Sequence, residues 1–245
     1  MNIDFSNIQT ASAIPGAAAM IETFRAIGYS LETAVADIID NSISAGARNI
    51  YINRVWRGGE SMIIIKDDGH GMSDEEIIQA MRPGAQNPLE ERSLTDLGRF
   101  GLGLKTASFS QCRNLTVISK KKGGNVNFWT WNLDYVALTN RWELVRWLPD
   151  ESENMLDDVD SGTVVVWSNL DRVLPPLTRV DDENDKRKFS EAFDKVKSHL
   201  AMTFHRFLED KSFKLYWCSH EIKPWNPFCL NEKKATNNAD RLYWK

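Results

Sequence analysis

The chain has 245 residues, of which 42% are hydrophobic and 26% are charged, and its formal net charge at pH 7 is −4. This length can bury a substantial core, and the small negative charge argues against a surface dominated by nucleic-acid binding. No apolar run approaches the ~18 residues that a membrane span requires, so we expect no membrane contact. The three cysteines form no Cys-x-x-Cys pair, which fits a reducing compartment, and we expect a cytoplasmic protein.

Apolar periodicity predicts the elements of the first third of the chain, which are in order a helix, a helix, a strand, a strand and a helix. They cover residues 17–27, 31–45, 49–53, 62–66 and 74–81. Gly28 is expected to end the first helix. Ser30 has the short hydroxyl side chain that is typical of an N-cap, and it predicts the start of the second helix.

Polar residues form a stripe on the helix expected over 31–45. Asp37, Asp40, Asn41 and Ser44 are spaced three and four apart, so they share the face opposite the apolar residues. A helix face that only meets solvent is the alternative, but such a face usually carries Lys and Glu. Two carboxylates, an amide and a hydroxyl without a counter-charge are better suited to a metal ion and a water molecule.

The segment from Asp67 to Met72 directly follows an apolar strand and contains Gly69 and Gly71. A strand that ends in a carboxylate and continues through glycines can hold an acid at the floor of a pocket while backbone passes close to a ligand. Alone, the same pattern also describes an ordinary turn between a strand and a helix. If it forms a pocket, we expect Asp67 rather than Asp68 to face the ligand.

Two glycine-containing segments come next. Residues 82–92 combine Pro and Gly with charged residues and little apolar content, which predicts a mobile loop and a candidate lid. Glycines then lead into a helix from Gly98 to Phe109, where free backbone N–H groups and Lys105 suit an anion. The glycine spacing differs from that of the Walker loop, and by itself it is a weak indication of phosphate binding.

The rest of the chain predicts a β-rich region followed by a long helix. The expected strands cover residues 115–119, 125–133, 142–148, 161–167, 213–217 and 221–224, and the helix covers residues 185–210. The basic run Lys120 to Lys122 is expected at a hairpin turn, and Pro175-Pro176 at a boundary. His199 and His205 are six residues apart, which is the wrong spacing for two metal ligands on one helical face.

Taken together, four segments resemble the motifs of the GHKL ATPase superfamily, which includes gyrase, the ninety-kilodalton heat-shock chaperones, histidine kinases and MutL. The segments are residues 37–47, 67–72, 98–105 and 161–163, and the resemblance extends over roughly residues 17–170. Its details look closest to the MutL and MORC branch. The resemblance implies an α+β fold, a two-layer Bergerat-type sandwich of a mixed, mostly antiparallel sheet with helices on one face. It also implies an ATP-binding domain over residues 1–175 and the start of a transducer-like domain over residues 176–245.

The resemblance also implies roles for individual residues. Asp67 would accept the adenine amine with help from Thr163, Asn41 would bind Mg²⁺, and Asp37 would be the general base. Lys105 would assist catalysis at the β- and γ-phosphates. The full set implied to bind ATP is Asn41, Ala45, Asp67, Gly69, Gly71, Met72, Gly98, Phe100, Gly101, Leu102, Gly103, Leu104, Lys105 and Thr163.

The function implied is Mg²⁺-dependent ATP binding and slow hydrolysis, with lid closure and ATP-driven homodimerisation as a switch for a larger protein in DNA repair or bacterial defence. Any DNA contact would come from regions outside this chain. The family usually has Glu where this chain has Asp37, and often has Asp where it has Ser44. A nucleotide-gated clamp or sensor with negligible hydrolysis is therefore the alternative. A histidine kinase is less favoured, because no upstream helix carries a phosphoacceptor histidine.

Overall fold

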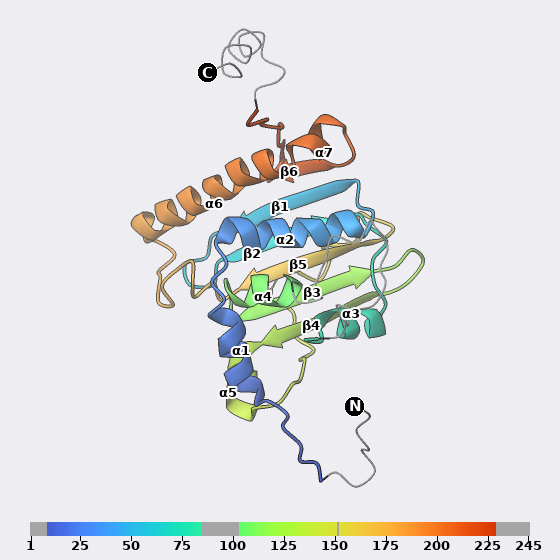
Figure 1. Cartoon of the computed structure of the whole chain (residues 1–245). Coiled ribbons are helices and arrows are strands. Elements are labelled where there is room, and N and C mark those ends of the chain that lie inside the picture. The colour runs from blue at the N-terminus through green and yellow to red at the C-terminus, as the bar shows by residue number, and fades with distance from the viewer. Residues whose placement is uncertain (1–8, 85–102, 151, 229–245) are drawn as a thin grey trace, which may run out of the picture.

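The computed structural model describes residues 9–84, 103–150 and 152–228, and it confirms the α+β fold with a mixed, mostly antiparallel sheet (Figure 1). The strands are β1 (Asn49–Val55), β2 (Met62–Asp67), β3 (Asn114–Lys120), β4 (Val126–Asn132), β5 (Gly162–Ser168), β6 (Lys214–Trp217) and β7 (His220–Glu221). The helices are α1 (Ala17–Arg25), α2 (Leu31–Ser44), α3 (Asp74–Met81), α4 (Gly103–Phe109), α5 (Leu133–Thr139), α6 (Glu183–Thr203) and α7 (His205–Glu209).

The strands form one seven-stranded sheet in the order β4-β3-β5-β2-β1-β6-β7. Every neighbouring pair is antiparallel except β1 and β6, which are parallel. The strands β5 and β2 are central, and every residue of β5 is buried. This position explains why both sequences are almost continuously apolar, because a strand that is covered on both faces has no reason to alternate.

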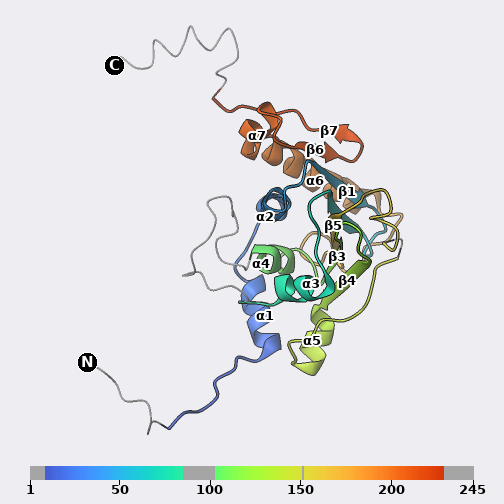
Figure 2. The same cartoon turned by 90° about the vertical axis from the view of Figure 1, so that its right-hand side faces the viewer.

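Helices α1, α2, α3 and α4 lie on one side of the sheet, as the side view shows (Figure 2). Ile63 and Ile65 of β2 point into the large core on this side, while Met62 and Ile64 point to a smaller apolar cluster on the other side. Leu156, which precedes β5, belongs to that second cluster. Alternate side chains of β2 therefore face the helices on one side of the sheet and the segment before β5 on the other.

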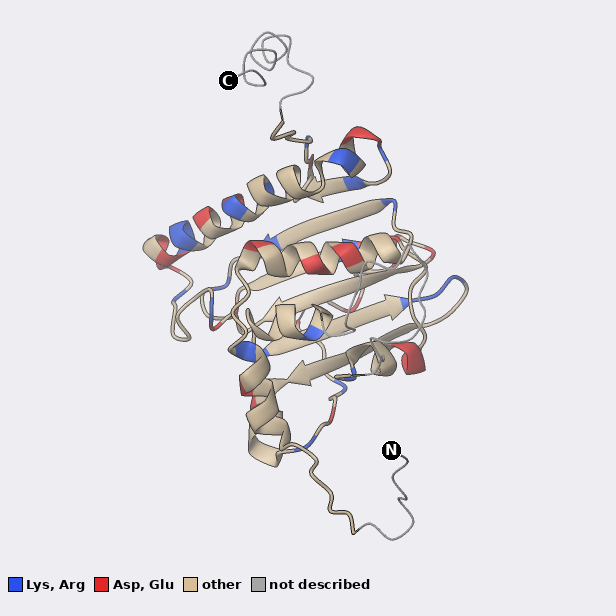
Figure 3. Cartoon of the chain, viewed as in Figure 1, with Lys and Arg blue, Asp and Glu red and all other residues tan. Residues whose placement is uncertain are grey.

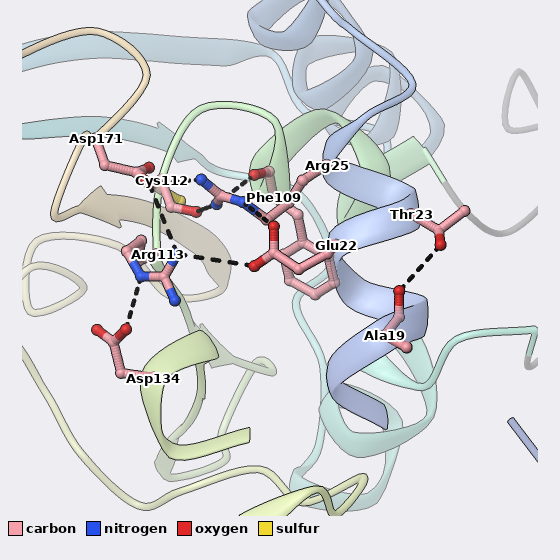
Figure 4. Close-up of polar contacts among 9 residues, drawn as sticks. All are labelled: Ala19, Glu22, Thr23, Arg25, Phe109, Cys112, Arg113, Asp134 and Asp171. Atoms are coloured by element: carbon pink, nitrogen blue, oxygen red, sulfur yellow. Dashed lines mark hydrogen bonds and ion pairs between the residues drawn. The ribbon is translucent and has the colours of Figure 1, made fainter. Parts of the chain in front are cut away.

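Arg25 ties the end of α1 to the middle of the fold (Figure 4). Its side chain donates hydrogen bonds to the carbonyl oxygens of Phe109 and Cys112, at 2.8 and 2.9 Å, and to a carboxylate oxygen of Asp171 at 2.6 Å. Only 4% of Arg25 is exposed. A buried guanidinium is tolerated here because acceptors surround it in the fork geometry that Arg requires.

Three sequence predictions differ from the structure. Residues 142–148 form no strand and make only an isolated bridge, between Val145 and Thr130. Helix α5 was not predicted; it begins where the side chain of Asn132 accepts a hydrogen bond from the Tyr135 N–H, so the chain turns out of β4 at a cap that the alternating pattern hides. The helix expected over 185–210 breaks at Phe204, where the backbone leaves helical geometry between α6 and α7.

The segment after Pro176 adds to the same sheet. Strand β6 pairs with β1, α6 packs against α2, and Phe193 of α6 belongs to the main core. The division of the chain into 1–175 and 176–245 remains a prediction. Within the described ranges, no helix is both long enough and apolar enough to span a membrane.

Candidate functional site

Asp67, Thr163 and Ser119 lie side by side across three neighbouring strands. Thr163 of β5 is in register with Asp67 of β2 on one side and with Ser119 of β3 on the other. Cross-strand neighbours project to the same face of a sheet, and Ile65, two residues before Asp67, points into the core beneath the helices. This polar row therefore faces the helical layer at the end of the sheet.

Asp67 is held in place on both carboxylate oxygens. Oδ2 accepts a hydrogen bond from the Ser42 hydroxyl of α2, and Oδ1 accepts one from the Gly69 N–H, each at 2.9 Å. Burial raises the pKa of Asp67, and the hydrogen bonds from Gly69 and Ser42 act in the opposite direction. A carboxylate has about four lone-pair sites, and the hydrogen bonds from Ser42, Gly69 and the Thr163 backbone leave one for a ligand.

The neighbouring Asp68 has a different environment. Its Oδ1 accepts hydrogen bonds from the backbone N–H groups of Arg48 and Asn49, at 2.7 and 2.8 Å, and its Oδ2 accepts one from the Asn49 amide at 2.7 Å. These bonds join the start of β1 to the end of β2. The Asp68 carboxylate is thus engaged in the turn, whereas Asp67 faces the helical layer.

The two glycines after these carboxylates let three segments approach closely. A Cβ atom on Gly69 would lie 2.9 Å from the Cβ and the carbonyl oxygen of Ala45, at the end of α2. Gly71 has a φ of +67°, and a Cβ atom there would overlap the carbonyl oxygen of Lys120. Side chains larger than hydrogen are therefore excluded at both positions, and Ala45 is brought next to the Asp67 turn.

The polar stripe of α2 lies between Asp67 and α4. Figure 3 shows α2 with acidic residues and no basic ones along its length. Asp37 and Asp40 are half-buried, while Asn41 is exposed. Burial raises the pKa of Asp40 to about 6, and the neighbouring charge of Asp37 adds to the increase.

Tyr29, which the sequence did not single out, connects Asp37 to α4. The Thr106 hydroxyl donates a hydrogen bond to the Tyr29 hydroxyl, which in turn donates one to the Asp37 carboxylate. Burial raises the pKa of Asp37, and the hydrogen bond from Tyr29 opposes this change. A Cβ atom on Gly103 would lie 3.7 Å from Asp37 Oδ2, so the start of α4 is close to this carboxylate.

Lys105 points from α4 toward the end of α3. Its side chain is buried, and its ammonium donates a hydrogen bond to the Ala80 carbonyl oxygen at 2.9 Å. Burial lowers the pKa of Lys105 to about 8. Its neighbour Leu104 packs against the main core.

Part of the predicted site lies outside the described residues. Gly98, Phe100, Gly101 and Leu102 belong to this part, as does most of the candidate lid, of which only residues 82–84 are described. Met72 is described, and its N–H donates a hydrogen bond to the Ser119 hydroxyl at 2.8 Å. Ser119 was also missed from the sequence, because a serine on an apolar strand has no motif that distinguishes it.

A separate cavity of about 720 Å³ is lined by α1, α3, β4 and residues 142–144. Phe24, Ile78, Trp129, Trp131 and Trp142 are among its lining residues, and so are residues 82–84 at the start of the candidate lid, but none of the residues predicted to bind ATP lines it. Three tryptophans thus line a largely apolar space that contains no member of the polar row.

Comparison with known proteins identifies the class. The model of the family of histidine kinase-, DNA gyrase B- and HSP90-like ATPases matches residues 29–163. This range contains α2, the end of β2, α4 and the start of β5, and the chain belongs to this family. It is a GHKL ATPase domain of the MutL- and MORC-like branch.

Individual relatives support that branch. The chain is 33% identical over 91 residues to the ATPase morc-1 of Caenorhabditis elegans, which is 37% of this chain and 10% of the relative. It is 32% identical over 95 residues to the DNA mismatch repair protein MutL of Thermus aquaticus, covering 38% of this chain and 17% of the relative. It is 38% identical over 92 residues to MutL of Colwellia psychrerythraea, covering 36% of this chain and 14% of the relative. The matched region thus spans less than a fifth of each of these relatives.

Proposed function

We propose that this chain binds ATP with Mg²⁺ between the end of β2, α2 and α4, and that it hydrolyses ATP slowly. The observation that carries the proposal is the Asp67 carboxylate, which is only 5% exposed and lies beside Thr163 with its oxygens oriented by Ser42 and Gly69. A buried carboxylate that accepts the adenine amine forms a charge-assisted hydrogen bond. Ala45 and Met72 flank this end of the site and would pack near the base.

The residues at the other end of the site fit Mg²⁺. The described residues contain no group of three or more His, Cys, Asp or Glu side chains that would hold a metal ion by themselves. Mg²⁺ usually takes only one or two protein oxygens and completes its shell with phosphates and waters, so the exposed amide of Asn41 is sufficient. The bound ion would neutralise charge on the phosphates.

We assign the general base to Asp37, one helical turn before Asn41. Its raised pKa and its position near the start of α4 suit a carboxylate that orients water toward a phosphate held there, with Lys105 as the nearby positive charge. The Asp side chain is one methylene shorter than Glu. We therefore expect slow turnover.

A clamp or sensor with negligible hydrolysis is the second candidate. The hydrogen bond from Tyr29 favours it, because that bond occupies part of the Asp37 carboxylate on which hydrolysis depends. In both cases we propose that the segment 82–92 closes as a lid and that ATP drives dimerisation, as a switch for a larger protein. The MutL relatives are named as DNA mismatch repair proteins, which supports a role in DNA repair with DNA bound by regions outside this chain.

The neighbouring pair Asp67 and Asp68 provides the test. We expect Asp67→Asn to weaken ATP binding at least ~100-fold, because the amide places donors opposite the adenine amine and the charge is lost. Asp68→Asn is the matched control, and its effect is expected on stability rather than affinity, since its partners Arg48 and Asn49 lie at the start of β1. Calorimetric titration with ATP and Mg²⁺ measures both, and normal affinity in Asp67→Asn contradicts the assignment of this pocket.

A further inference from the structure

Ser119 is a fully buried hydroxyl at the centre of the polar row, with 0% of its surface exposed. Its Oγ lies 2.8 Å from Thr163 Oγ1 and donates a hydrogen bond to the Gly162 carbonyl oxygen at 3.0 Å. It also accepts the hydrogen bond from the Met72 N–H at 2.8 Å. Ser119 therefore connects β3 and β5 to the turn after Asp67.

All three contacts of Ser119 Oγ are hydrogen bonds at the same time in only one arrangement of the two hydroxyl hydrogens. A serine hydroxyl has one hydrogen to donate and two lone pairs to accept with. The hydrogen of Ser119 is directed to Gly162 and one lone pair receives the Met72 N–H, so the remaining lone pair is left for Thr163. Thr163 is consequently the donor in this pair, and its own lone pairs remain available to a ligand.

We propose that Ser119 is a specificity-determining residue, which positions the Thr163 hydroxyl as a hydrogen-bond acceptor next to Asp67. This inference rests on the proposed function and extends it to the choice of base. Two neighbouring acceptors favour a purine whose 6-position carries an amino group, because the amine donates directly or through water. A purine with a 6-oxo group presents a third acceptor, and its oxygen stays unpaired.

ATP and ITP test this, since they share the triphosphate and differ in the 6-substituent of the base and in the hydrogen on N1 that accompanies the 6-oxo group. We expect the wild-type chain to bind ATP more tightly than ITP. In Ser119→Ala the Thr163 hydroxyl is free to turn and donate, so the ratio of the two affinities should fall about fivefold to tenfold. Calorimetric titration with each nucleotide and Mg²⁺ gives the ratio.

Thr116 supplies the matched control on the same strand. Its hydroxyl lies 2.7 Å from that of Thr130, which donates to the Trp147 carbonyl oxygen, so it forms a similar buried hydroxyl pair away from the site. Thr116→Val should leave the ATP to ITP ratio unchanged. Ser119→Cys nearly keeps the side-chain size but weakens the hydrogen bonds, so we expect an intermediate ratio of ATP to ITP affinity. This variant provides the test if Ser119→Ala does not fold.

A double-mutant cycle separates positioning from a general structural effect. If Ser119 acts through Thr163, then Ser119→Ala should not change the ratio further in a Thr163→Val background. Two results overturn the inference while the proposed function stands. One is an unchanged ratio of ATP to ITP affinity in both Ser119→Ala and Ser119→Cys. The other is that Ser119→Ala changes this ratio equally in the wild-type and Thr163→Val backgrounds. A wild-type chain that binds no ATP would instead reject the proposed function itself.

Discussion

Asp37 is half-buried on α2, and the Tyr29 hydroxyl holds it from the side of α4. The Tyr29 contact orients the carboxylate and stabilises its charged form, while burial favours the protonated form. We expect the balance at this residue to decide whether bound ATP is hydrolysed, since Asp37 is the proposed general base.

Substitution of Asp37 tests that balance. We expect Asp37→Ala to keep ATP binding and to reduce hydrolysis by at least ~100-fold, because removing a general base typically costs 10²–10⁴-fold. Phosphate release under single-turnover conditions with Mg²⁺ measures the effect, and Glu32→Gln, in the first turn of the same helix, is the control. Unchanged hydrolysis in Asp37→Ala would remove Asp37 from this role and make Asp40, whose pKa is raised to about 6, the next candidate.

Lys105 predicts a pH dependence of binding. Burial lowers its pKa to about 8, so the ammonium is charged below that pH and becomes neutral as the pH rises through it. If the charged form holds phosphate, ATP affinity should be constant from pH 6.5 to 7.5 and should fall by up to about tenfold per pH unit above 8. The measurement is the ATP affinity of the wild-type chain and of Lys105→Met from pH 6.5 to 9.5. The variant should bind more weakly without this fall, and the same fall in both proteins would contradict the prediction.

At the scale of the elements, α2 is the helix that joins the two ends of the site. Ser42 contacts Asp67, Ala45 packs on the Gly69 turn, and Asp37 lies near the start of α4. Helix α4 is in turn connected to α1, because Arg25 binds the carbonyl oxygens at and just after its end. The charge network around α1 therefore supports the helix from which Lys105 extends (Figure 4).

The two arginines of this network differ in burial, which predicts different contributions to stability. Arg25→Met leaves two carbonyl oxygens and the Asp171 carboxylate without their donor, and we expect a loss of about 3–5 kcal/mol in the free energy of unfolding. Arg113→Met removes ion pairs with the largely exposed Asp134 and Glu22 and a longer one, of 3.7 Å, with Asp171, and it should cost about 1 kcal/mol. Urea unfolding measures both. Equal losses would show that the Arg25 contacts contribute no more than a surface ion pair.

At the scale of the whole molecule, the seven strands and the helical layer place the proposed nucleotide site at one end of the sheet. The apolar cavity lined by Trp131 and Trp142 contains none of the residues proposed to contact ATP, although residues 82–84 also line it. The proposed ATP-driven dimerisation involves the whole domain rather than one side chain.

Sedimentation velocity tests that association. The 28.0 kDa chain should sediment as a monomer without nucleotide and shift to a dimer with a non-hydrolysable ATP analogue and Mg²⁺. Asp67→Asn, which should not bind the analogue, is the control and should stay monomeric. A wild-type chain that binds the analogue by calorimetry and still sediments as a monomer would contradict dimerisation without contradicting ATP binding.

The sequence alone determined the family, the α+β class and most of the elements, since these follow from local patterns. The period of the apolar residues gave α2 and β2, Ser30 marked a helix start, and the glycines after Asp67 marked a tight turn. Local patterns failed where tertiary contacts decide the conformation. Residues 142–148 have the composition of a strand, yet they form a bridge to β4 only at Val145. At the end of β4, the cap at Asn132 starts helix α5, where the alternating pattern predicts a continuing strand.

Only the tertiary structure decided how the site is assembled. Asp67 and Thr163 were both expected to contact adenine from their motifs, but Ser119 and Tyr29 belong to no motif and were found through their partners. Ser119 acquires its place from the register of β3 with β5, and Tyr29 from the packing of α2 against α4. A motif records which residue types recur along the chain. The direction of a hydrogen bond depends on which donor and acceptor atoms the folded chain brings together. The distances between residues far apart in the sequence cannot be read from a pattern along it.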